Sequence, residues 1–246
     1  MSPARPVVLV TGAAKRIGAA ISRRLHAAGC DLALHYRHSA GEMQALVDAL
    51  EAERPGSTLA LQADLADTAA LPGLIERTAA QFGRLDGLVN NASTFYATPL
   101  GTITEAQWDE LFASNAKAPL FLAQAAAPHL RAARGAIVNI LDIYAERPLA
   151  ELAAYAGSKA ALTALTKALA LSLAPEVRVN GIAPGAVIWP ETGKSVDDIR
   201  HIIDRTPLGR AGSPDEIADA VQWLLFQAGF MTGEVLRLDG GRCLTL

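Results

Sequence analysis

Three side chains that could transfer protons lie close together in the sequence. Asp142 follows an apolar run, residues 136–141, which is typical of a buried strand, and Tyr155 and Lys159 lie in an alanine- and leucine-rich run to about residue 174, which is typical of a long helix. Residues four apart share one helix face, and open α/β sheets bind ligands at the carboxyl ends of their strands. The phenol, the ammonium and the carboxylate are therefore expected to meet in one cleft.

The chemistry of these groups would be acid–base catalysis. A neighbouring ammonium favours the phenolate, so Lys159 is expected to lower the pKa of Tyr155 toward working pH. Partial burial of Asp142 would raise its pKa and Lys159 would lower it, so the sequence leaves the charge of Asp142 at pH 7 open. The spacing alone also fits an ordinary exposed pair, and the motifs upstream decide between these interpretations.

A glycine turn near the amino terminus could bind a phosphate group. The apolar run 7–10 predicts a buried strand, and residues 11–18 turn it into a helix that ends near residue 28. Unpaired amide groups and the helix dipole make such a turn an anion site. Five residues separate Gly12 from Gly18, and Arg16 stands where dinucleotide-binding turns commonly have a middle glycine.

The end of the second predicted strand, residues 31–36, indicates which nicotinamide cofactor would bind. A cofactor with a free ribose 2′-hydroxyl usually meets an Asp or a Glu at this place. The chain has Arg37, His38 and Ser39 there instead. Cations and a hydroxyl suit the 2′-phosphate of NADP, and a solvated polar loop is the alternative interpretation.

Two other stretches could line a ligand site. Asn91, Ala92 and Ser93 follow a predicted strand, and small residues there let the backbone approach a ligand, while Phe95 offers a surface for stacking. Asn115 lies among apolar residues of a helix that begins at about residue 105. A buried amide needs partners, so Asn115 is either a packing bridge or part of a polar relay.

Composition and length narrow the class of protein. The chain has 246 residues, 51% of them hydrophobic, which fits one domain with a sizeable core. The net charge of −3 and the lack of a basic run give no sign of nucleic-acid or anionic-membrane binding. Cys30 and Cys243 have no metal-ligand spacing, so no metal site is expected. No stretch resembles a membrane span or a signal peptide, so we expect a soluble cytoplasmic protein.

Strands and helices alternate along the whole chain. This order predicts a single doubly wound parallel α/β sheet of the Rossmann type, formed by one domain over residues 1–246. The expected strands cover residues 7–10, 31–36, 59–63, 85–89, 136–141 and 234–238. Further helices are expected over residues 42–53 and 71–82 and near 196–205.

Taken together, the motifs resemble those of the short-chain dehydrogenases/reductases over essentially the whole chain. The matching residues are Thr11, Gly12, Gly18, Asp64, Asn90, Asn91, Ala92, Asn115, Tyr155, Lys159, Pro184, Gly185 and Asp239 to Gly241. Three details are similar to the pteridine reductase branch. Arg16 replaces the middle glycine, and Asn91-Ala92-Ser93, with Phe95 after it, replaces the usual Asn-Ala-Gly. Asp142 stands where most of the superfamily has serine.

The resemblance implies NADPH as cofactor, a pterin or folate as substrate, and a homotetramer. Cofactor-binding residues would be Gly12, Lys15, Arg16, Ile17, Gly18, Tyr36, Arg37, His38, Ser39, Asp64, Leu65, Asn91, Ala92, Ser93, Tyr155, Lys159, Pro184 and Gly185. Substrate-binding residues would be Arg16, Ser93, Phe95, Asp142, Tyr155 and Trp189, the last within a substrate loop near 186–210. Catalytic residues would be Asp142, Tyr155, Lys159 and Asn115.

The reaction implied is hydride transfer from NADPH to a dihydropterin or an oxidised pterin, with dihydrofolate as a further substrate, and protonation assisted by Tyr155 and Asp142. Two alternatives stay open. A 3-oxoacyl or other carbonyl reductase would be expected to have a hydroxyl at position 142. A protein that only senses NADPH on the same fold would tend to lack the Tyr155 and Lys159 pair.

Overall fold

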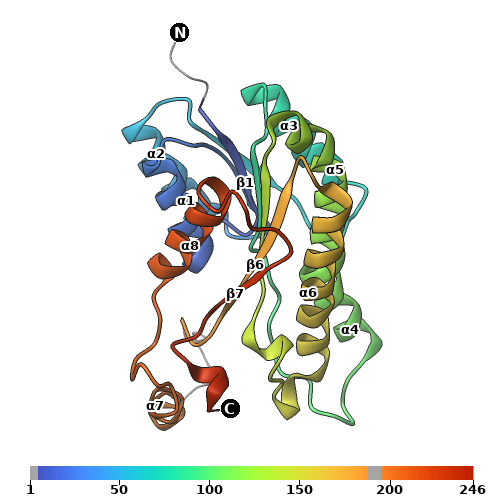
Figure 1. Ribbon diagram of the computed structural model, residues 1–246, viewed down its shortest axis with the longest axis vertical. Helices are drawn as coiled ribbons and strands as arrows, with labels where there is room; N and C mark the ends of the chain where they lie inside the picture. The colour runs from blue at the N-terminus through green and yellow to red at the C-terminus, as the bar shows by residue number, and fades with distance from the viewer. Residues whose placement is uncertain (1–4, 188–194, 246) are drawn as a thin grey trace.

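The computed structural model describes residues 5–187 and 195–245. Within them, seven strands form one parallel sheet in the order β3-β2-β1-β4-β5-β6-β7 (Figure 1). The strands are β1 (Val7–Val10), β2 (Asp31–Tyr36), β3 (Thr58–Gln62), β4 (Gly87–Asn90), β5 (Ala136–Ile140), β6 (Arg178–Pro184) and β7 (Val235–Leu238). This sheet confirms the predicted doubly wound α/β class.

Helices cover both faces of the sheet. They are α1 (Arg16–Ala27), α2 (Ala40–Glu53), α3 (Leu71–Phe82), α4 (Glu105–Phe112), α5 (Ala118–Ala133), α6 (Ala153–Leu173), α7 (Val196–Asp204) and α8 (Pro214–Phe226). Figure 1 shows α1, α2 and α8 on one face and α3, α5 and α6 on the other. Each face has its own apolar core, because strand residues alternate in direction and supply both layers.

The strand order reverses between β1 and β4. Both strands run parallel and pair directly, with Val8 beside Gly87 and Val10 beside Val89. The connections from these strands lead to opposite sides of the sheet, which leaves a crevice at their carboxyl ends. Open α/β sheets bind ligands in such a crevice.

Two elements were not predicted from the sequence. The first is β6, in which Arg178, Asn180 and Gly181 interrupt the apolar pattern that marks a buried strand. Each has a structural reason. The guanidinium of Arg178 donates to Leu224 O and Leu225 O. The side chain of Asn180 donates to Met231 O and accepts from Glu234 N, and a Cβ on Gly181 would lie 2.5 Å from Leu141 Cδ1. The second is α8, whose capping box at Ser213 and Glu216 marks its start.

The segment after β6 contains the predicted helix near 196–205, which the structure confirms as α7. Ser195 caps it, since its hydroxyl accepts from Asp198 N and the Asp198 side chain accepts from Ser195 N. Trp189, which was predicted to bind substrate, lies outside the described residues.

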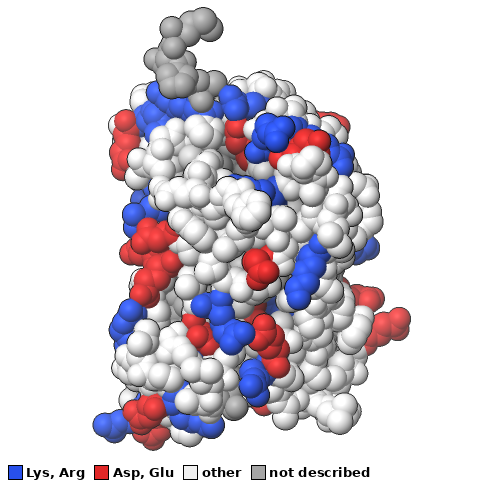
Figure 2. Space-filling view, in the orientation of Figure 1, with Lys and Arg blue, Asp and Glu red and all other residues white. Residues whose placement is uncertain are grey.

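The surface carries both signs of charge. On the face shown in Figure 2, basic and acidic side chains are interspersed among wide uncharged areas. Among the helices of the described residues, none is both long and apolar enough to cross a membrane. The same residues contain no cluster of His, Cys, Asp or Glu that could hold a metal ion.

Candidate active site

Two adjoining cavities lie at the carboxyl ends of the central strands. One has a volume of about 390 Å³ and the other about 590 Å³, within the usual range for ligand sites. The residues that line both of them are Lys15, Arg16, Ile17, Asn91 and Ser93. We call the first the cofactor cavity and the second the substrate cavity, according to the sequence motifs that each contains.

The glycine turn forms one wall of the cofactor cavity. Gly12 has φ +61°, and a Cβ on it would lie 2.9 Å from the backbone of Ala92. A Cβ on Gly18 would lie 2.1 Å from Gly12 O, so α1 can begin this close to the turn only with glycine there. The Asn91 side chain donates to Thr11 O and Gly12 O. The turn is therefore fixed before any ligand binds.

Arg16 adopts a backbone conformation that favours glycine. Its φ is +55°, and it begins α1 directly after Lys15. The left-handed region costs a residue with a side chain roughly 1–2 kcal/mol. Strain of this kind is found where a side chain is needed at a functional site, and the side chain of Arg16 lines both cavities.

Because of this strain, we expect two substitutions of Arg16 to differ in thermal stability while weakening substrate binding equally. Arg16→Gly is expected to be more stable than Arg16→Ala by about 1 kcal/mol, because only glycine adopts this φ without cost, and Tm should be roughly 2–4 °C higher. Both variants should show about a tenfold higher KM for the reducible substrate, since both lose the guanidinium. Thermal denaturation and steady-state kinetics measure the two effects. Equal Tm values would show that position 16 is not strained.

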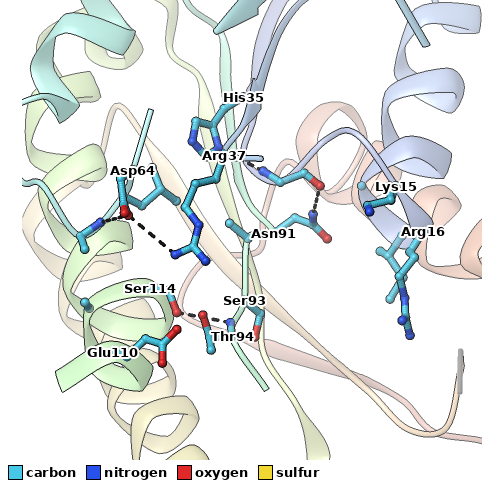
Figure 3. A pocket seen from close by; sticks show the side chains of 17 residues that line it. Lys15, Arg16, His35, Arg37, Asp64, Asn91, Ser93, Thr94, Glu110 and Ser114 are labelled. Carbon is cyan, nitrogen blue, oxygen red and sulfur yellow. Dashed lines mark hydrogen bonds and ion pairs between the residues drawn. The ribbon is translucent and has the colours of Figure 1, made fainter. Parts of the chain in front are cut away.

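The far end of the cofactor cavity carries the residues predicted to select NADP. Figure 3 shows the Arg37 guanidinium beside Asp64, and the Nη1–Oδ1 distance is 3.9 Å. Both side chains are about half exposed, so this ion pair is weak and leaves Arg37 available to a ligand. Leu65 also lines the cavity. Tyr36, His38 and Ser39 do not, so of Arg37, His38 and Ser39, which were predicted to bind the 2′-phosphate, Arg37 alone lines it.

His35 was not predicted as a site residue, yet it connects the second strand to the glycine turn. It is 2% exposed and lines the cofactor cavity. Gly12 N donates to its Nδ1 at 3.2 Å, so Nε2 carries the hydrogen and donates to Ala63 O at 3.1 Å. Burial lowers the pKa of His35, which favours this neutral form. Its position within an apolar strand gave no signal of the role.

Asp142, Tyr155 and Lys159 meet at the substrate cavity, as their spacing predicted. Tyr155 Oη donates to Asp142 Oδ2 at 2.7 Å. Lys159 Nζ donates to Ile140 O at 2.9 Å and lies 6.0 Å from the centre of the Tyr155 ring. Tyr155 and Lys159 are 3% and 2% exposed, whereas Asp142 is partly exposed.

The predicted effect of Lys159 on Tyr155 is wrong for this arrangement. The pKa of Tyr155 is raised well above its ordinary value, first by burial and then by the charge of Asp142 and the hydrogen bond to it. The pKa of Lys159 is itself lowered to about 8 by burial. The sequence showed the ammonium close to the phenol but could not show that a carboxylate lies closer.

The pKa of Asp142 is raised, because burial outweighs three opposing effects. The opposing effects are the hydrogen bonds from Tyr144 N and from Tyr155 and the charge of Lys159. The Tyr144 N bond, 2.8 Å to Oδ1, holds the carboxyl group in place. Asp142 and Tyr155 therefore form one hydrogen-bonded pair in which protonated forms are favoured.

Asn115 lies in a π-helical turn, Ala113–Lys117, between α4 and α5. Such turns interrupt the helix and are frequent at functional sites. Its Oδ1 accepts from Ser93 Oγ at 2.9 Å, and its Nδ2 donates to Ser158 Oγ at 3.0 Å. Asn115 thus connects the loop after β4 to α6. This is the packing bridge, one of the two alternatives that the sequence left open. Its role in a proton relay stays a prediction.

The substrate cavity combines polar and aromatic walls. The Phe95 ring meets the Tyr155 ring edge to face at 4.7 Å and is 46% exposed. Pro184 and Gly185 also line this cavity, and a Cβ on Gly185 would lie 2.7 Å from Asp239 Cα. Ala186, Val187 and Ile202 line the cavity from the predicted substrate loop, and lining residues that were not predicted are Ile140, Leu141, Ile143 and Tyr144.

The amino-acid sequence matches known proteins over nearly its whole length. A family model described as enoyl-(acyl carrier protein) reductase matches residues 12–242. Pteridine reductase 1 of Leishmania tarentolae is 37% identical, over 99% of this chain and 98% of the relative. The chain belongs to the short-chain dehydrogenase/reductase superfamily.

Other members of the superfamily match over similar lengths. 3-Oxoacyl-(acyl-carrier-protein) reductase of Staphylococcus aureus is 33% identical, over 95% of this chain and 96% of the relative. 3beta-Hydroxysteroid dehydrogenase 1 of Eggerthella lenta is 34% identical, over 96% and 93%. These relatives are named for different substrates, so the similarity identifies an oxidoreductase of this superfamily and does not identify its substrate.

Proposed function

We propose that this short-chain dehydrogenase/reductase is an NADPH-dependent pteridine reductase. The observation that carries the proposal is the 2.7 Å hydrogen bond between Tyr155 and Asp142 inside the cleft. A tyrosine and a lysine would serve any carbonyl reductase of the superfamily. A carboxyl group beside the tyrosine adds a second proton carrier, which suits a ring nitrogen that must be protonated.

The cofactor cavity fits a dinucleotide. Glycine at position 18 lets α1 begin directly against the turn, where a Cβ would collide with Gly12 O, and amide groups at the start of α1 attract anions. Arg37 would bind the 2′-phosphate, and Lys159 would hold the nicotinamide ribose. NADPH, when bound, would supply the hydride, and the protein's contribution is to orient it and to move the proton.

The proton would leave from the pair formed by Tyr155 and Asp142. Reduction of a C=N bond adds a hydride to carbon and a proton to nitrogen. With Asp142 protonated, Oδ2 would donate to Tyr155 Oη across the 2.7 Å distance. Tyr155 would then give its own hydroxyl proton to the substrate nitrogen and take the Asp142 proton in its place, which leaves Asp142 as a carboxylate. The raised pKa of Asp142 supports this protonated form. Phe95 would stack on the flat pterin ring, and Arg16 and Ser93 would bind its polar edge.

A 3-oxoacyl or other carbonyl reductase is the second candidate, and the similarity to a 3-oxoacyl reductase favours it. Rates of NADPH oxidation with dihydrobiopterin, dihydrofolate and an acetoacetyl thioester would distinguish the candidates. We expect kcat/KM to be highest for the pterin. A preference for the thioester would contradict the proposal, and no turnover of any of the three would favour a protein that only senses NADPH.

The cofactor preference can be tested at Arg37. We expect Arg37→Ala to lower kcat/KM for NADPH by roughly 10- to 100-fold and to leave the value for NADH nearly unchanged, because a charge-assisted hydrogen bond contributes about 1.5–3 kcal/mol. Arg24→Ala is the matched control, since Arg24 is paired with Asp219 on the surface, away from the cavities. Equal values for both cofactors in the unaltered enzyme would refute the assignment.

We further propose that the protein is a homotetramer. Ala160, Ala164 and Ala168 are exposed on one face of α6 and would let a partner helix come close, whereas Ala156, one turn earlier, is buried within the chain. Light scattering at micromolar concentration should give four times the chain mass of 25.8 kDa. Ala164→Glu should reduce that mass. A monomer in the unaltered protein would exclude the tetramer.

A further inference from the structure

A buried arginine lies behind the substrate cavity. Arg242 begins the C-terminal turn η4 (Arg242–Leu244) and is 5% exposed. Its Nη1 donates to Ile202 O at 3.0 Å. Burial raises the pKa of the Tyr144 phenol, and the nearby Arg242 guanidinium opposes this rise. Among residues 5–187 and 195–245, no carboxylate lies within ion-pair distance of it. Arginine is rarely buried without such a partner, because desolvation of its charge is costly.

Both partners of Arg242 belong to walls of the substrate cavity. Ile202 lies in the last turn of α7, and Tyr144 lies in η2 (Ile143–Ala145), directly after Asp142. Both line that cavity, whereas Arg242 does not. Figure 1 shows the C-terminal turn beside α7. One guanidinium therefore connects two walls that are far apart in the sequence.

The helix α7 depends on contacts of this kind. It has nine residues, and helices this short are marginal on their own. Ile202 O is among its last carbonyl groups, and a cation there is favoured by the helix dipole. Thr206 Oγ1 donates to the same oxygen at 2.8 Å. The end of the chain makes a second, exposed contact with the end of α7, where Arg205 Nη2 donates to Thr245 O at 2.6 Å.

We propose that Arg242 is a positioning residue, whose guanidinium sets the distance between α7 and Tyr144 and so the width of the substrate cavity. It would act through these walls and would not touch the substrate. The inference goes beyond the proposed function, because it holds for whichever substrate is reduced in this cleft. It predicts that loss of the guanidinium weakens substrate binding and leaves cofactor binding unchanged.

The test replaces Arg242 by methionine, which retains an apolar stem of similar length. We expect the KM of the substrate to rise about tenfold, as for loss of a hydrogen bond from a charged group, with kcat less affected. The Kd of NADPH, followed by fluorescence titration, should not change. Tyr144→Phe, which retains the ring, should show a smaller rise in KM, and combining it with Arg242→Met should give less than the product of the two effects.

A second measurement needs no substrate. Trypsin should cleave α7 after the exposed Arg200 faster in Arg242→Met than in the unaltered protein, because the end of the helix is no longer held. Thr245→Val is the matched control, since it removes the hydroxyl that bonds to Arg205 O and Arg242 O and leaves the guanidinium in place. The bond that it removes at the end of α7 is exposed, so Thr245→Val should change both KM and the cleavage rate less than Arg242→Met does.

Kinetics are measured with dihydrobiopterin and with the acetoacetyl thioester. If only the thioester is reduced, the proposed pterin activity fails, while the KM for the thioester still tests Arg242. An unchanged KM and an unchanged cleavage rate in a folded Arg242→Met protein would overturn the inference. The same changes in Thr245→Val would also overturn it, because they would assign the effect to the whole tail. If Arg242→Met does not fold, Tyr144→Phe is the test, and an unchanged KM in that variant would overturn the inference.

Discussion

Replacing Asp142 by alanine is expected to lower kcat for a pterin by roughly 10²–10⁴-fold, the usual contribution of general acid catalysis, with NADPH binding nearly unchanged. The reason lies in the contacts of its two oxygens. Oδ2 shares a hydrogen bond with Tyr155 Oη, and Oδ1 accepts from Tyr144 N. The alanine variant removes the second proton carrier and leaves Tyr155 to act alone. Stopped-flow or steady-state absorbance of NADPH measures the loss.

Asp142→Asn is the matched control for structure. Asparagine retains an oxygen for Tyr144 N and nearly the same volume, but it cannot supply a proton. We expect it to be as slow as the alanine variant and more stable. If Asp142 only anchors the strand end, the alanine variant would lose thermal stability and keep its turnover. Full pterin turnover in folded Asp142→Ala would refute the mechanism.

The pH dependence gives an independent test of the same step. Burial raises the pKa of Asp142, so its proton is retained to higher pH than in an ordinary aspartate. If the protonated form is the active one, kcat should fall as pH rises through that raised pKa. Asp142→Asn has no such group and should lack this part of the profile. An identical profile in both proteins would assign the titration to another group.

Asp142→Ser should change the choice of substrate. Most of the superfamily is expected to have a serine at this position, where it serves uncharged ketones. The variant should therefore lose pterin turnover and gain rate with the acetoacetyl thioester. No gain with the ketone would indicate that other walls of the cavity, such as Phe95 or Tyr144, decide the substrate.

The sequence predicted the parts of the site that follow from strand ends and helix spacing. Tyr155 and Lys159 are four residues apart on α6, and Asp142 follows β5, so a local pattern was enough to place them together. The glycine turn was predictable for the same reason. Gly18 makes its tight contact with Gly12, inside the same short segment. Gly12 makes its tight contact with Ala92, which follows the neighbouring strand β4.

Other parts depend on residues that only the fold brings together. His35 binds the glycine turn because β2 lies beside β1, and Arg242 reaches Ile202 because the end of the chain returns to α7. Neither contact has a sequence pattern. The same limit explains the wrong pKa prediction for Tyr155. The spacing showed its distance along the helix from Lys159 but not its 2.7 Å distance from Asp142.

Tyr155→Phe is expected to lower kcat by a similar factor, roughly 10²–10⁴-fold, because it removes the group that passes the proton to substrate. The ring and its edge-to-face contact with Phe95 at 4.7 Å should persist, so the fold should not change. Tyr96→Phe is the matched control. It removes a phenol that lines neither cavity and that donates to Gln107 O and to Glu110 Oε2. Glu110 lines the cofactor cavity, so kcat is compared at saturating NADPH and should be retained.

The double variant Asp142→Ala/Tyr155→Phe decides whether the two residues form one proton-donating unit. Residues that act as a unit are strongly non-additive, since removal of either one already disables the step. We therefore expect the double variant to be about as slow as the slower single variant. Two independent proton donors would instead give a loss near the product of the single losses. That result would leave both residues catalytic but would exclude proton transfer through the 2.7 Å hydrogen bond between them.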